Sequence, residues 1–217
     1  MYVFDDKNYF KINLRRSIQM LLIASVKRFF LPKTRKTIKD YIQIGCGLNK
    51  FDNFENLDFY NSSFSFWKKS KYIQHDFRYK LPFEDNTFKG AFSEHVIEHL
   101  YYNDSKFLLS EICRILKKSA IFRCTVPGLD LYVENYKTKK NDNKYFLQFE
   151  NGCDAIRDLV HNYGHLSVWD TKTLKREMLN AGFSSVKICN FGVGENNDLI
   201  KDLKDREFQT IYLEGTK

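Results

Sequence analysis

The residues best suited to chemistry stand where short apolar runs end. Gly45-Cys46-Gly47 closes the run at residues 41–44, and its two glycines permit a tight turn that a ligand can approach closely. Asp58 ends the next run, eleven residues after Gly47. A carboxylate at that place can accept hydrogen bonds from both hydroxyls of a ribose.

A second acidic residue completes an ordered series. Asp76 ends another short run and precedes Phe77, so this pair can accept the exocyclic amine of an adenine and pack against its face. The turn does not complete the dinucleotide-binding pattern G-x-G-x-x-G, because position 50 is Lys50. The series therefore predicts a nucleoside site without a pyrophosphate cradle.

The elements that would position these residues alternate between strand and helix from residue 41 onward. We expect strands at residues 41–44, 54–58, 72–76, 90–93, 120–126, 185–189 and 208–213, and helices from about residue 104 and over 171–181. This alternation predicts an α/β fold, a doubly wound, seven-stranded, mostly parallel sheet of Rossmann-like type. Ligands of such sheets bind beyond the carboxyl ends of the strands, where the turn and both acids fall.

Ser93-Glu94-His95 also falls at a strand end, so it should lie near the same ligand. Histidine suits proton transfer near neutral pH, and His95 is the best placed by this argument. His161 and His165 follow a long segment and could reach an acceptor from the opposite side. These three histidines are the candidate catalytic residues.

Four blocks resemble successive parts of the class I S-adenosylmethionine-dependent methyltransferase family. They are IQIGCGLNKFDNFENLDF, HDFRYKLPFEDNTFKGAFSEHVIEHL, EICRILKKSAIFRCTVPGLD and HLSVWDTKTLKREMLNAGFSSVKI, and the part of the second from Leu81 to His99 is the most specific. The compact chain with its basic leader resembles bacterial methyltransferases of surface-polysaccharide gene sets. The resemblance implies a Rossmann-like methyltransferase fold that uses S-adenosyl-L-methionine.

The resemblance also assigns roles to positions. The glycine turn would pass the methionine half of the cofactor, Asp58 would hold the ribose, and Ser93, Glu94 and His95 would lie near the sulfonium. The expected cofactor-binding set is Gly45, Cys46, Gly47, Asn49, Asp58, Phe59, Asp76, Phe77, Ser93 and Glu94. The third glycine of the family's loop is replaced, and the gap to Asp58 leaves little room for a full first helix.

Two further segments are expected on either side of this core. Residues 1–40 form a basic leader, and residues 10–31 within it read as an amphipathic helix that packs on the domain or lies on an anionic membrane surface. Residues 41–217 form the methyltransferase domain, in which residues 129–165 are long for a connection and aromatic, as lids often are. We expect a cytoplasmic protein, with peripheral contact to the inner face of the membrane through the leader helix.

Five scattered cysteines fit no zinc pattern, so the sequence predicts reduced thiols and no metal site. The formal charge of +8 leaves a nucleic-acid partner open. The base-methylating motifs Asn-Pro-Pro-Tyr and Pro-Cys are both absent, which disfavours that alternative. The preferred function is O-methylation of a small-molecule or glycan acceptor. The alternatives are an RNA methyltransferase and a non-catalytic cofactor-binding protein.

Overall fold

A computed structural model of the 217-residue chain describes residue 18 and residues 34–59, 72–138 and 143–217. The expected leader helix at 10–31 lies outside these residues apart from Ile18. No helix in the described part of the chain is both long and apolar enough to cross a membrane.

Seven strands form one sheet in the order β3-β2-β1-β4-β5-β7-β6. All neighbours pair in parallel except β7, which is antiparallel to both β5 and β6. The strands are β1 (Tyr41–Ile44), β2 (Phe54–Asp58), β3 (Ile73–Gln74), β4 (Phe88–Glu94), β5 (Leu116–Pro127), β6 (Ser185–Cys189) and β7 (Thr210–Thr216). The mostly parallel, seven-stranded sheet expected from the sequence is confirmed.

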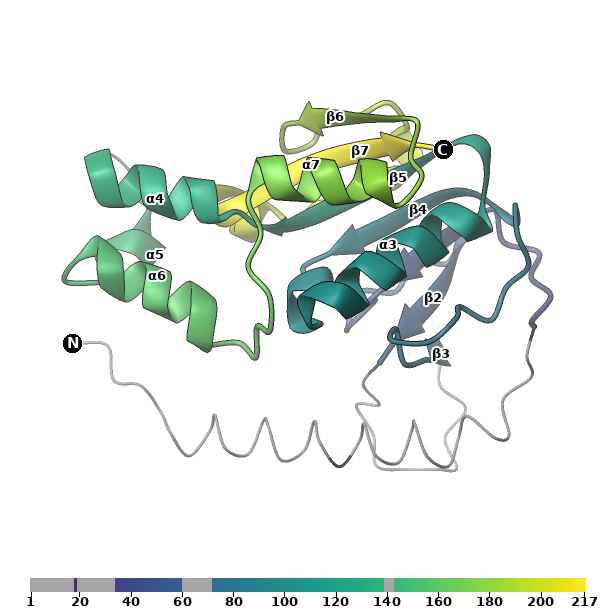
Figure 1. The fold of residues 1–217 in the computed structure, drawn as a ribbon, viewed down its shortest axis with the longest axis horizontal. Helices are drawn as coiled ribbons and strands as arrows, with labels where there is room; N and C mark the ends of the chain where they lie inside the picture. The colour runs from purple at the N-terminus through teal and green to yellow at the C-terminus, as the bar shows by residue number, and fades with distance from the viewer. Residues whose placement is uncertain (1–17, 19–33, 60–71, 139–142) are drawn as a thin grey trace.

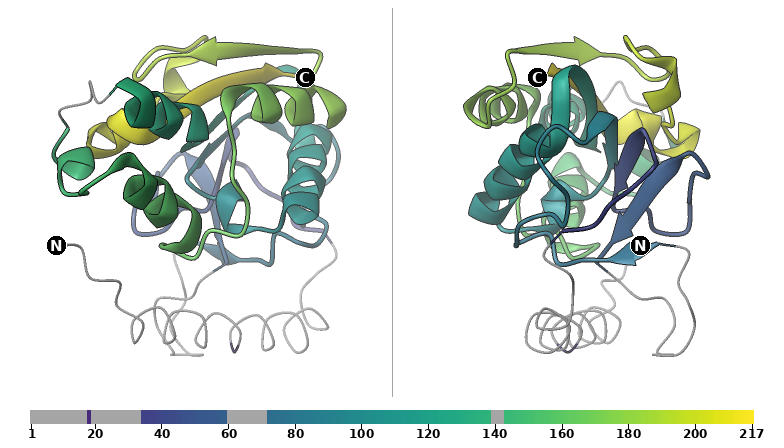
Figure 2. Two further views of the ribbon diagram at one scale, coloured as in Figure 1. Left: turned by 60° about the vertical axis from the view of Figure 1, so that its left-hand side comes forward. Right: turned by 90° about the vertical axis from the view of Figure 1, so that its right-hand side faces the viewer.

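Helices connect these strands and frame one end of the sheet. They are α3 (Tyr102–Ile115), α4 (Leu129–Thr138), α5 (Lys144–Leu147), α6 (Gly152–His161) and α7 (Thr171–Asn180), with 3-10 turns η2 (Ile97–His99), η3 (Asn197–Leu199) and η4 (Lys204–Gln209). Figures 1 and 2 show α3 and α7 on the same side of the sheet.

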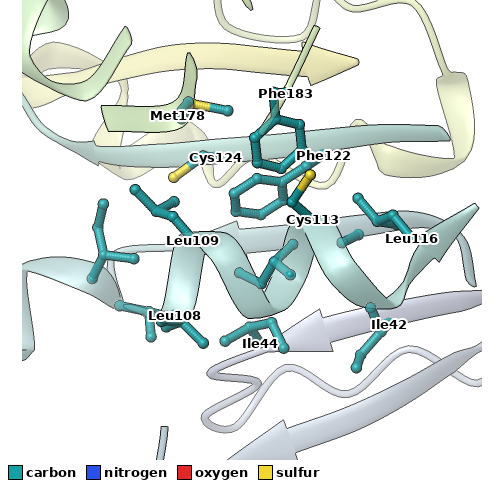
Figure 3. Close-up of a cluster of buried hydrophobic side chains, with 14 of the residues drawn as sticks. Ile42, Ile44, Leu108, Leu109, Cys113, Leu116, Phe122, Cys124, Met178 and Phe183 are labelled. Carbon is teal, nitrogen blue, oxygen red and sulfur yellow. The ribbon is translucent and has the colours of Figure 1, made fainter. Parts of the chain in front are cut away.

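The main core lies between the sheet and the helices α3 and α7. Leu108, Leu109 and Ile112 of α3 are fully buried, as the helical spacing of these residues predicts. Figure 3 shows Leu109 and Cys113 beneath Phe122 of β5, while Leu108 lies near Ile44 of β1. The opposite face carries a smaller cluster, formed by Phe54, Phe92, Ile121 and Leu199.

Local signals fix the ends of α7. The Asp170 side chain accepts the backbone N–H of Thr173 at 2.7 Å and so caps the first turn. Gly182 follows the helix with φ +107°, a conformation that favours glycine. Elsewhere the boundaries moved: the third strand has only two residues, and residues 204–209 form η4 before the last strand begins at Thr210.

Residues 129–165 contain three helices rather than a long irregular loop. Tyr132, Phe146 and Phe149, three aromatic residues of this expected lid, are buried in the segment's own core with Ala155 and Leu159. Figure 1 shows α4, α5 and α6 gathered at one end of the molecule. Aromatic residues in this segment therefore hold it together.

Candidate active site

A cavity of about 540 Å³ opens beyond the carboxyl ends of β1, β2 and β4. A volume of this size suits a small-molecule or cofactor site. Nine of the ten residues expected to bind the cofactor line it, namely Gly45, Cys46, Gly47, Asn49, Asp58, Phe59, Asp76, Phe77 and Glu94. Ser93, the tenth, is buried with 1% of its surface exposed and is not part of the lining.

The glycine turn is held against β2 by its own backbone. The N–H groups of Gly45 and Cys46 both donate to the carbonyl of Leu57, each at 2.9 Å. Gly45 has φ +73°, and a Cβ there would overlap Val96 Cγ2, so only glycine fits. Gly47 has φ +50° and open space on its Cβ side. The turn thus leaves its backbone accessible to a ligand.

Asp58 joins the turn to the end of β2. Its Oδ2 accepts the N–H of Gly47 at 2.6 Å, and only 8% of the residue is exposed. Burial raises the pKa of the neighbouring Cys46 thiol to about 12, so this thiol is neutral and contributes through its backbone. The carboxylate is fixed beside the cavity at the place where the sequence predicted a ribose.

Asp76 already has a strong partner within the protein. The guanidinium of Arg78 donates to both of its carboxylate oxygens, at 3.0 and 2.6 Å, and the Arg78 backbone N–H donates at 3.1 Å. An adenine amine at Asp76 would have to share that carboxylate with Arg78. Arg78 lines the same cavity, and the sequence reasoning did not single it out.

Glu94 and His95 extend from the end of β4 into the cavity wall. Burial raises the pKa of Glu94, whose Oε1 accepts the N–H of Leu203 at 2.9 Å. His95 has φ +54°, and its Nε2 lies 2.8 Å from the hydroxyl of Thr210. Burial lowers the pKa of His95 well below its usual value, so the imidazole is neutral.

The other two candidate histidines lie outside the lining. His161 is exposed at the end of α6. His165 is half-buried, and its ring lies 5.0 Å from that of His99, which does line the cavity. The structure therefore brings His95 to the cavity directly and His165 only through His99.

Glu98 is a buried acid that the sequence reasoning passed over. It is 2% exposed, and neither of its carboxylate oxygens has a hydrogen-bond partner among the described residues. Burial raises its pKa to about 8. In the sequence Glu98 stands between apolar residues of the block that resembles the family, and no local pattern there marks it as a functional residue.

Further residues complete the cavity from parts of the chain without a clear sequence signal. Gln43, Tyr101, Tyr163, Lys201 and Arg206 all belong to the lining. The side-chain oxygen of Gln43 is buried without a partner in the described structure. The side-chain oxygen of Gln43 can therefore accept a hydrogen bond from a ligand. Its place inside β1 could have indicated this, since a buried polar residue in a strand needs a partner.

Comparisons with known proteins agree with this geometry. Residues 43–124, from β1 to β5, match a family model described as a methyltransferase domain. A SAM-dependent methyltransferase from Archaeoglobus fulgidus aligns over 98% of this chain and 100% of its own, with 19% identity and a TM-score of 0.54. One from Thermotoga maritima aligns over 97% and 99%, with 16% identity and a TM-score of 0.53.

A third similar structure, a methyltransferase from Mesorhizobium loti, aligns over 88% of this chain and 95% of its own, with 14% identity and a TM-score of 0.51. No curated protein sequence matches the chain. At such identities the structural likeness establishes the fold.

The sheet order and the glycine turn at its carboxyl edge define a class I methyltransferase fold. Residues 43–124, which hold the glycine turn, Asp58 and Glu94, match the model of a methyltransferase domain.

Proposed function

We propose that the chain transfers a methyl group from S-adenosyl-L-methionine to a hydroxyl oxygen of a small-molecule or glycan acceptor. The observation that carries this proposal is one continuous cavity. It reaches from the glycine turn and Asp58 past Glu94 to Tyr163 and Arg206. The residues that would bind the methyl donor, the proposed proton acceptor and the residues that would bind the methyl acceptor thus line the same cavity.

The residues present fit the cofactor in three respects. Gly47 presents open space to the cavity, Asp58 offers a fixed carboxylate for the ribose, and Gln43 offers a buried carbonyl oxygen without a partner. The Gln43 oxygen suits the ammonium group of the methionine half. Phe77 and the pair of Asp76 with Arg78 would frame the adenine.

The cofactor supplies a methyl group on a positively charged sulfur. The acceptor oxygen forms a bond to the methyl carbon, the carbon–sulfur bond breaks, and its electron pair stays on the sulfur. The hydroxyl proton must leave, and we assign it to the Glu94 carboxylate, which lines the cavity and whose pKa is raised by burial. The walls of the cavity hold the two reactants in line, which is the larger part of such catalysis.

The geometry favours Glu94 over the three candidate histidines as the base. His161 is exposed and lies off the cavity, and His165 reaches it only through His99. His95 lines the cavity, but burial depresses its pKa and weakens it as a base. His95 instead supports the wall through its bond to Thr210.

The outer wall suits an oxygen-rich, anionic acceptor. Tyr101 and Tyr163 belong to the lining and are 62% and 59% exposed, so both expose apolar rings with polar tips. Lys201 and Arg206 add two positive charges to the same lining. Sugars that carry a phosphate or an acid combine the faces and the charge that these residues would bind.

The test is transfer of a labelled methyl group from S-adenosylmethionine to a panel of nucleotide sugars, lipid-linked sugars and RNA. We expect label on a sugar oxygen of an anionic acceptor, located by two-dimensional NMR of the product. Label on RNA, or on a nitrogen atom of any acceptor, would overturn the proposal. Label on no member of the panel, with cofactor binding intact, would also count against a glycan acceptor.

A further inference from the structure

Three potential metal ligands meet beside the cavity. One ligand atom each from Glu98, His99 and His165 lie within 4.8 Å of one another. Glu98 is almost fully buried, and both of its carboxylate oxygens lack a hydrogen-bond partner among the described residues. A buried carboxylate is costly unless a cation or a proton neutralises it. No lysine or arginine that the structure describes forms an ion pair with it.

The backbone fixes how two of the imidazoles are protonated. His99 Nδ1 lies 3.3 Å from the carbonyl of Gly164, and His165 Nδ1 lies 2.6 Å from the carbonyl of Leu159. A carbonyl only accepts, so in both rings the proton is on Nδ1 and the lone pair is on Nε2. His99 Nε2 faces Glu98 Oε1 at 3.9 Å. Metal-binding histidines are commonly oriented in this way by the other ring nitrogen.

A third imidazole is arranged in the same sense. The Thr210 hydroxyl donates to the carbonyl of Arg206 at 2.7 Å, so it accepts from His95 Nε2 at 2.8 Å. The lone pair of His95 is then on Nδ1, which lies 3.8 Å from Glu98 Oε1. The lone pair of His95 Nδ1 and the carboxylate of Glu98 thus face each other, an arrangement that needs a proton or a cation between them.

We propose that Glu98, His99 and His165 bind a divalent metal ion of the kind that prefers mixed nitrogen and oxygen ligands, such as Zn²⁺, Mn²⁺, Fe²⁺ or Co²⁺. Two histidines and one carboxylate are a common ligand set for such ions and leave coordination positions open. Metal–ligand bonds of about 2.0–2.2 Å place neighbouring ligand atoms about 3.0–3.6 Å apart. The 3.9 Å between His99 Nε2 and Glu98 Oε1 therefore needs a small contraction, and a pair as far apart as 4.8 Å needs one of about 1–2 Å.

The location gives this ion a use in the reaction. His99 belongs to the cavity lining, so the proposed ion would lie next to the space that the acceptor would occupy. An oxygen of the acceptor can complete the coordination, and a metal ion lowers the pKa of a hydroxyl that binds it. This part of the inference rests on the proposed function. It limits the possible acceptors to molecules with a hydroxyl group that can bind a metal ion.

The experiment measures metal binding directly, without turnover. Protein freed of metal by a chelator is titrated with Co²⁺ and Zn²⁺ by calorimetry, and the Co²⁺ complex is followed by its visible absorption. We expect one ion per chain. Glu98→Gln keeps the shape of the side chain but removes the charge, and it should weaken binding by about 100-fold or more, as should His165→Ala. His161→Ala, an exposed histidine on α6, is the matched control and should bind like the wild type.

Two outcomes would overturn the inference. One is folded wild-type protein, checked by circular dichroism, that binds neither ion at up to about 1 mM. The other is Glu98→Gln or His165→Ala protein that binds as well as the wild type. Either result would mean that a proton, shared between Glu98 and the imidazoles, neutralises the cluster. Calorimetry with S-adenosylmethionine on the same metal-free protein tests the cofactor site separately, so failure of one proposal is distinguishable from failure of the other.

Discussion

Asp58 shapes the glycine turn before any ligand arrives. Its Oδ2 accepts the Gly47 N–H at 2.6 Å, and hydrogen bonds to a charged acceptor are among the stronger ones in proteins. The same carboxylate lines the cavity. In the proposed complex it would hold the turn and receive the ribose hydroxyls together, so its loss should affect affinity more than a single contact would.

The first prediction concerns Asp58→Ala. We expect the affinity for S-adenosylmethionine to fall by roughly 10- to 150-fold, since lost hydrogen bonds to a charged group cost about 1.5–3 kcal/mol. Isothermal titration calorimetry measures the change. Asp52→Ala, an exposed acid on the neighbouring turn, is the control and should bind normally. Equal affinity of both variants would remove Asp58 from the cofactor site.

The second prediction concerns Glu94 as the proton acceptor. Only its ionised form can take a proton, so kcat should rise as the pH rises through its pKa. Because burial raises that pKa, the acidic limb should lie above the ordinary range of a glutamate. Glu94→Gln should lower kcat by about 10²–10⁴-fold and abolish the limb. His161→Ala should leave the profile intact, and a near-normal rate for Glu94→Gln would exclude this role.

The sequence could predict those site residues that are marked by their immediate neighbours in the chain. Gly45, Asp58 and Glu94 each follow directly after an apolar run, and parallel strands bring such ends to one edge. The group of Glu98, His99 and His165 gives no such signal. Its ligands are two adjacent residues and one 66 positions later, brought together by two backbone segments that no periodic pattern relates.

At the scale of elements, the turn after β1 is packed against the turn that opens η2. Gly45 sits directly on the Val96 side chain, which is 8% exposed. Residues 45–53, all of which the structure describes, form turns rather than a helix. The connection between β1 and β2 is therefore short, as the sequence indicated. Its contact with Val96 helps to hold the glycine turn in place, as a helix would otherwise do.

The third prediction compares two glycines with similar backbones. Gly45 and Gly192 have φ +73° and +67°, but a Cβ at Gly192 would meet nothing within 4 Å. Alanine at either position would cost about 1–2 kcal/mol of stability, because a residue with a Cβ is strained in this left-handed backbone conformation. Gly45→Ala should lose more stability in urea denaturation than Gly192→Ala, because it also displaces Val96. The additional change Val96→Ala should restore part of the difference, and equal losses in both single variants would refute the packing account.

Element boundaries were least predictable where no long periodic pattern exists. α3 and α7 followed their apolar spacing closely, and α7 begins at its capping residue Asp170. In residues 129–165, Tyr132, Phe146 and Phe149 pack on one another through short helices, whereas Tyr163 lines the cavity. Residues 190–209 have no strong periodicity, yet they supply Lys201, Leu203 and Arg206 to the cavity.

At the scale of the whole molecule, one buried arginine joins the sheet to that last segment. Arg123 of β5 is fully buried, and its guanidinium donates to Asp202 at 2.8 and 2.5 Å and to Glu214 of β7 at 3.0 Å. It also donates to the carbonyls of Asn190 and Val193, at 3.1 and 2.9 Å. The network therefore holds residues 190–203 against the sheet, and with them one wall of the cavity.

The last prediction concerns a variant that removes the Arg123 network. Arg123→Met keeps a long apolar side chain but leaves Asp202 and Glu214 buried without their cation, which should cost about 3–5 kcal/mol of unfolding free energy. The matched control is Arg157→Met, because Arg157 pairs with Asp154 on the surface of α6, where an ion pair contributes about 0–1 kcal/mol. Urea denaturation measures both variants. Since Lys201 and Leu203 belong to the segment that Arg123 holds, acceptor affinity should fall in the Arg123 variant even under conditions where it is fully folded. A stable Arg123 variant would mean that the apolar cluster around Leu199 alone anchors this segment to the sheet.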